Sequence, residues 1–82
     1  MNTHTLRFPI TIGTEKITAV TLRRPTVEDV MIVNRESSSA PEVEVRLVSR
    51  LSGLPPATIG ALDMQDYRSV QAILAAMMAP AG

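Results

Sequence analysis

The side chains that could do acid–base or metal chemistry are few. His4 is the only histidine of the chain, and there is no cysteine. A lone histidine without a second His, a Cys or a convergent carboxylate provides neither a metal site nor a working general base. We therefore expect His4 to be solvated in a mobile terminal segment, and we expect the protein to use no metal and no other cofactor.

Two carboxylates, Asp63 and Asp66, lie three residues apart and could share one helix face, as an acid–base pair would require. Their position at the start of an apolar helical pattern favours a structural interpretation. An Asp at the N-cap and another at the third helical position satisfy free N–H groups and the positive end of the helix dipole. We interpret both residues as helix caps.

The serines and glycines of the chain form no catalytic pattern. The serines form no Gly-x-Ser-x-Gly turn and the glycines form no phosphate-binding loop, so nothing resembles an active site and we predict no enzyme.

Arg23 and Arg24 either contact an acidic partner or pair with Glu28 and Asp29. We favour the second interpretation, in which such surface pairs contribute about 0–1 kcal/mol.

The most suggestive feature for binding is an apolar, methionine-bearing face near the C-terminus. Methionine side chains adapt to varied partners, but they also fill irregular cores, and the sequence leaves both interpretations open. An exposed part of this face would mark a protein–protein contact. The candidate partner-binding residues are Tyr67, Val70, Leu74, Met77 and Met78.

The composition bounds the class of protein. Its 82 residues, 45% hydrophobic and 20% charged, predict a single small folded domain over residues 1–82, with residues 1–4 and 79–82 as mobile ends. The formal net charge is zero, which argues against nucleic acid as the main partner. No apolar stretch approaches the roughly 20 residues that span a bilayer, so we expect no membrane association and a cytoplasmic location.

The first quarter of the chain predicts a β-hairpin. Apolar and polar residues alternate over residues 5–12, Gly13 supplies a turn, and a second β-rich run covers residues 16–23. Pro9 cannot donate to a ladder, which places its strand at an edge. The apolar phase of the second run slips midway, so we predict a bulge near Ala19–Val20 that turns both phases toward the core.

The remainder predicts three to four short α-helices, giving an α+β fold. Thr26 and Asp29 form a capping box for the first helix, which ends near Arg35. Pro41 suits the first turn of the second helix and Gly53 its end. Residues 57–62 form a short helical turn, and the last helix follows Asp63. A DNA-binding helix-turn-helix is disfavoured, because the intervening turn is too long and two Asp residues would face the phosphates.

Two segments together resemble the tail assembly chaperone family of contractile-tailed bacteriophages and prophages. The first, at residues 21–29, reads TLRRPTVED and joins the hairpin to the first helix. The second, at residues 51–56, reads LSGLPP and is followed by Leu62-Asp63 and Asp66-Tyr67. The resemblance covers about residues 17–74, and its specificity comes from the combination of segments.

The resemblance implies a small adaptor that coats the long, helical tape-measure protein in the cytoplasm of the bacterial host. It implies that the adaptor keeps apolar helices soluble while the tail tube polymerises, and that a longer product made by ribosomal frameshifting can accompany the short form. Self-association and contacts with tail-tube components remain open as further interactions. The alternatives are a structural subunit of a phage tail or other particle, and a small DNA-binding regulator.

Overall fold

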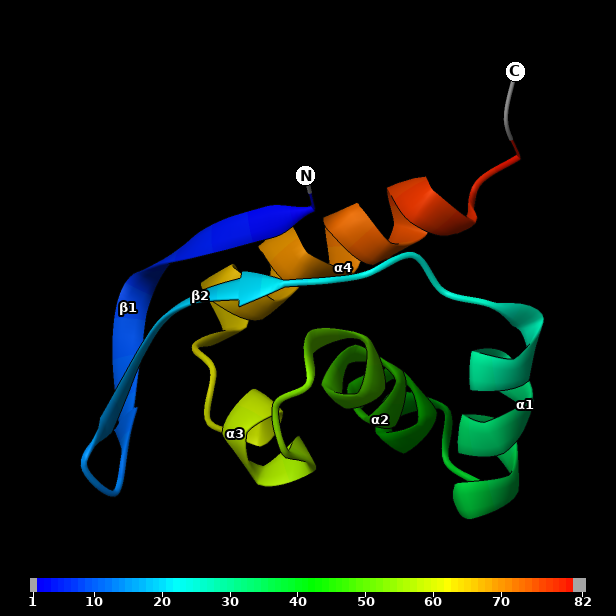
Figure 1. Cartoon of the computed structure of the whole chain (residues 1–82), viewed down its shortest axis with the longest axis horizontal. Coiled ribbons are helices and arrows are strands. Elements are labelled where there is room, and N and C mark those ends of the chain that lie inside the picture. The colour runs from blue at the N-terminus through cyan, green and yellow to red at the C-terminus, as the bar shows by residue number, and fades with distance from the viewer. Residues whose placement is uncertain (1, 81–82) are drawn as a thin grey trace.

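A computed structural model describes residues 2–80 and shows an antiparallel β-hairpin followed by four helices (Figure 1). The elements are β1 (Thr3–Ile12), β2 (Glu15–Thr21), α1 (Val27–Glu36), α2 (Ala40–Ser52), α3 (Pro56–Gly60) and α4 (Met64–Met78). The predicted α+β class is confirmed. The prediction of mobile ends falls partly on residues 1, 81 and 82, which lie outside the described range.

The hairpin is a two-stranded sheet whose register runs from Thr3 opposite Thr21 to Ile12 opposite Glu15. Gly13 has a φ of 62°, a left-handed conformation that glycine adopts without steric cost. The bulge predicted in β2 is wrong, because the register shift lies in β1, between Thr5 and Ile10.

The cause of this shift is visible in the hydrogen bonds of β1. Pro9 has no N–H to donate, and the amides of Arg7 and Phe8 donate to the carboxylate of Asp66 in α4 instead of to β2. Ala19, which the predicted bulge would have turned inward, is exposed. The interruption of the ladder thus comes from a tertiary contact.

The helix ends follow local rules. Thr26 and Asp29 form the predicted capping box of α1, and Ser39 caps α2, whose second residue is Pro41. Gly53, with a φ of 76°, ends α2. The predicted pair of Glu42 and Arg46 is present at 3.2 Å.

The core fills a single layer between α4 and the pair of helices α2 and α3, with β2 passing between them (Figure 1). Between its outermost Cα positions the molecule extends 36 × 30 × 18 Å, so it is flattened along the direction of view in Figure 1. Aliphatic side chains build the core, as the near-absence of aromatic residues requires. The buried hydrophobic residues are Leu6, Ile17, Val20, Leu22, Val33, Leu47, Val48, Leu51, Ile59, Leu62, Val70, Leu74 and Met77.

Candidate functional site

His4 is mostly buried and has a partner, so the expectation of a solvated, unpaired histidine is wrong. The residue lies in β1, and its Nε2 atom is 2.9 Å from Oδ1 of Asp66. Its side chain is only 19% exposed. Because an ionised carboxylate only accepts hydrogen bonds, the imidazole nitrogen is the donor. β1 packs along α4, and this contact, 62 residues away in sequence, was invisible to local patterns.

The predicted capping role of Asp66 is also wrong. Its carboxylate is fully buried and accepts hydrogen bonds from the amides of Arg7 at 2.8 Å and Phe8 at 3.0 Å, so it fastens β1 and does not cap α4. Burial alone would raise the pKa of Asp66, but the donors from Arg7, His4 and Phe8 lower it below the usual value. Asp63 is the N-cap as predicted, and accepts from the amide of Gln65.

Asp29 collects more donors than its capping role requires. Arg23 forms two hydrogen bonds with it, at 2.7 and 2.8 Å, and Arg50 adds one at 2.6 Å. The amide of Thr26 also donates. The bonds from Arg23, then those from Arg50 and Thr26, hold the pKa of this buried carboxyl far below its usual range. The predicted pairing of Arg23 with Asp29 is confirmed, whereas Arg24 donates to the carbonyl of Met77 at 3.4 Å.

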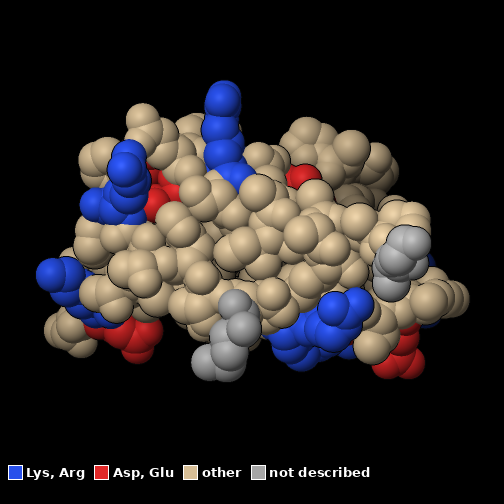
Figure 2. Space-filling view, turned by 90° about the horizontal axis from the view of Figure 1, so that it is seen from above, with Lys and Arg blue, Asp and Glu red and all other residues tan. Residues whose placement is uncertain are grey.

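The described residues 2–80 contain no group of three His, Cys, Asp or Glu side chains that could hold a metal ion. Over the same range, no helix is both long enough and apolar enough to cross a bilayer. Figure 2 shows one face of the molecule, on which charged side chains lie mostly around the rim and uncharged ones fill the middle. The middle of this face therefore carries few ionic groups.

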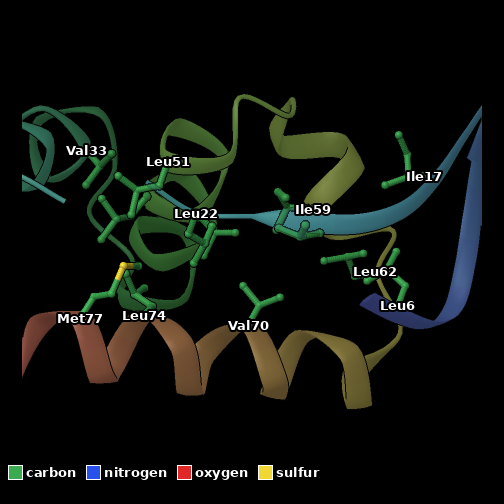
Figure 3. Close-up of a cluster of buried hydrophobic side chains, with 13 residues drawn as sticks. Leu6, Ile17, Leu22, Val33, Leu51, Ile59, Leu62, Val70, Leu74 and Met77 are labelled. Carbon is green, nitrogen blue, oxygen red and sulfur yellow. The ribbon is translucent and has the colours of Figure 1, made fainter. Parts of the chain in front are cut away.

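The predicted partner-binding residues divide between core and surface. Val70, Leu74 and Met77 point from α4 into the buried cluster (Figure 3). Met78 is 51% exposed. Tyr67 is partly buried, and its hydroxyl donates to Glu44 at 2.7 Å.

The three-helix groove, of about 400 Å³, lies where α1, α2 and the end of α4 meet. Its apolar lining comes from all three helices, and its polar lining residues are Asn34, Ser37, Ser38 and Glu44. The lining residues are Val30, Val33, Asn34, Ser37, Ser38, Ala40, Val43, Glu44, Leu47, Leu74 and Met78. Two of the predicted residues, Leu74 and Met78, therefore reach a surface groove.

The two-helix groove, of about 480 Å³, lies between α2 and the first half of α4. Ala40 and Glu44 line it as well as the three-helix groove, so the two grooves adjoin. Its lining residues are Ala40, Pro41, Glu44, Val45, Met64, Tyr67 and Gln71. Glu44 is the residue that sequence reasoning missed, and an acidic residue inside the otherwise apolar stripe of α2 was the available signal.

Comparison with known proteins identifies the family of this fold. The family model described as "Phage tail assembly chaperone proteins, E, or 41 or 14" matches residues 3–79, which includes the hairpin and all four helices. No curated protein and no solved structure gave a significant match. The match covers nearly the whole folded domain, so this chain belongs to the phage tail assembly chaperone family.

Proposed function

We propose that this chaperone is a non-enzymatic protein that binds apolar helical segments of the tape-measure protein and keeps them soluble during tail assembly in the bacterial cytoplasm. Family membership supports the role in tail assembly. The observation that supports an apolar helix as the ligand is the three-helix groove, whose lining comes from three helices and includes the aliphatic residues Val33, Leu47 and Leu74. Grooves of this kind take up the apolar face of an amphipathic helix.

The exposed methionine at the end of α4 supports a contact at the three-helix groove. Met78 lines the three-helix groove and is 51% exposed, and Leu74 lies beside it, one helical turn earlier. A flexible thioether side chain at the rim suits a chaperone that must accept many apolar segments of one long protein. Val70 and Met77, buried beneath, support α4 from the core.

A non-enzymatic role is supported by how the buried carboxylates are used. Asp29 accepts hydrogen bonds from Arg23, Arg50 and Thr26, and Asp66 accepts them from β1. A carboxylate committed to several structural donors has a low pKa and is a poor general base at neutral pH.

Co-expression with the tape-measure protein of the same phage tests the proposal. The tape-measure protein should be soluble and co-purify with the wild-type chain, and should be insoluble alone. Met78→Asp should abolish co-purification because it places a charge at the groove. Met31→Asp is the matched control, since Met31 is an exposed methionine that lines neither groove.

The alternative role makes a different prediction. If the tape-measure protein is equally soluble with and without this chain, the chaperone proposal is wrong. Finding the chain in purified particles would then identify it as a structural subunit of the tail.

A further inference from the structure

Glu44 is a half-buried carboxylate without a cationic partner. Tyr67 and Gln71 both donate to its Oε1 atom, each at 2.7 Å, and both donors are neutral. The other inward-facing carboxylates differ, since Asp29 has Arg23 and Arg50, and Asp66 has His4. Over residues 2–80, no Lys, Arg or His nitrogen lies within 4.0 Å of Glu44, and no donor reaches its Oε2 atom.

The two donors fix this carboxylate in place. Burial, and then the hydrogen bond to Glu44, raise the pKa of Tyr67, so that its phenol stays protonated and remains a donor. With Oε1 held by two hydrogen bonds, Oε2 has a defined position and an unused accepting capacity. Binding of a partner at Oε2 therefore costs little side-chain entropy of Glu44.

Glu44 lies where its free Oε2 acceptor can contact a bound ligand. The residue lines both the three-helix and the two-helix groove, and it is the only charged residue in either lining of the described chain. Apolar surface therefore extends to both sides of one negative charge. Along α4 the neighbouring stripe is Tyr67, Gln71, Leu74 and Met78, which spans roughly 16 Å, or three helical turns, at 1.5 Å per residue.

We propose that Glu44 selects the segments that the chaperone binds, by pairing through Oε2 with a lysine or arginine that interrupts the apolar face of the bound helix. The ligand class is thus an amphipathic helix of about three turns with one basic side chain between apolar residues. A helix with a basic side chain is the expected ligand because its positive charge complements the negative charge of Glu44. The inference rests on the proposed function, and it adds a chemical rule for which parts of the tape-measure protein are recognised.

The test uses overlapping 20-residue peptides that cover the tape-measure protein, with affinities for the full wild-type chain measured by fluorescence anisotropy. The tight binders should carry a Lys or Arg within an apolar helical stripe. Replacing that side chain by norleucine should weaken binding to the wild type about tenfold, the effect of roughly one hydrogen bond to a charged group. The same replacement should change binding to Glu44→Gln by less than about twofold, since that variant keeps the acceptor for Tyr67 but lacks the charge.

Two further variants isolate the charge of Glu44. Glu42→Gln removes one negative charge from the same helix but outside both grooves, and should leave the tenfold preference intact. Glu44→Lys should reverse the preference, so that peptides with Glu in place of the basic residue bind more tightly than the parent peptides. Circular dichroism of each variant establishes that the fold is retained.

The outcomes separate the two proposals. If peptides bind but the basic residue and Glu44 have no effect on affinity, the pairing is wrong and the chaperone role stands. If no tape-measure peptide binds, both are wrong. If sedimentation shows a wild-type dimer that Glu44→Gln converts to monomers, the carboxylate serves self-association and the proposed selection of a partner helix is overturned.

Discussion

At the residue scale, two buried aspartates join parts of the chain that are distant in sequence. Asp29 connects the residues after β2, through Arg23, with the end of α2, through Arg50. Asp66 connects α4 with β1. Each satisfies its oxygens with several donors, as a buried carboxylate must to offset its lost hydration.

Removing Asp29 should therefore destabilise the fold more than removing an exposed cap. Asp63→Ala should lower the free energy of unfolding by about 1 kcal/mol, the usual contribution of an N-cap. Asp29→Ala should lower it further, because the guanidinium groups of Arg23 and Arg50 are then left as unpaired like charges. Urea unfolding measures both variants, and equal midpoints would show that the Asp29 contacts contribute only as a cap.

The same carboxylates predict how stability depends on pH. The pKa values of Asp29 and Asp66 are lower in the folded chain than in the unfolded chain. Below about pH 4 the unfolded state therefore binds more protons, and the stability present above the unfolded pKa of about 3.9 is lost as pH falls toward the folded values. Urea midpoints at pH 6, 5, 4 and 3 should fall with pH, and less steeply for Asp29→Asn. Parallel profiles would contradict this assignment.

At the element scale, α4 has a side that faces the core and a side that faces the groove. The exposed fractions of its residues distinguish the two sides. Leu74 is 6% exposed and Met78 is 51% exposed, although they are one turn apart. Both also line the three-helix groove, so α4 connects the hydrophobic core with the candidate binding surface. Substitutions in α4 that lower stability should therefore be distinguishable from substitutions that weaken binding.

Leu74→Ala should lower the free energy of unfolding by about 2–5 kcal/mol, because it leaves a cavity in the core. Met78→Ala should change stability by no more than about 0.5 kcal/mol, because the side chain is half in solvent. Thermal unfolding gives the stabilities, and co-purification with the tape-measure protein gives binding. A stable Met78→Ala variant with unchanged binding would remove Met78 from the proposed contact.

The helix termini and the turn were predictable because their signals lie within a few residues of one another. Thr26 with Asp29, Pro41 and Gly53 are read from local spacing alone. The bulge was misplaced and His4 was misjudged because both depend on Asp66, about 60 residues away. The candidate groove was partly predicted through Leu74 and Met78, whereas Glu44 acquires its role only when α2 meets α4.

At the scale of the whole molecule, one core layer serves every element. The hairpin contributes Leu6, Ile17 and Val20 to the same buried cluster as Leu51 from α2 and Val70 from α4. A two-stranded hairpin is at best marginally stable alone in water, so this hairpin depends on the helices for its stability. The chain should therefore unfold as one cooperative unit.

The single tyrosine allows a test of that cooperativity. Tyr67 fluorescence reports on the contact between α2 and α4, while far-ultraviolet circular dichroism reports on all helices. The two transitions in urea should coincide, as expected for a small two-state domain. Separate midpoints would show that part of the molecule, such as α1, which packs chiefly against α2, unfolds independently.

The bond between β1 and α4 also has a consequence for how the protein is made on the ribosome. The first strand meets its partner, Asp66, only after more than fifty further residues have been synthesised. Until then Leu6 and Ile17 have no α4 to cover them, and the nascent hairpin is open to proteases and to premature association. Translation products that stop before α4 should consequently be degraded, and only chains with a complete groove should accumulate.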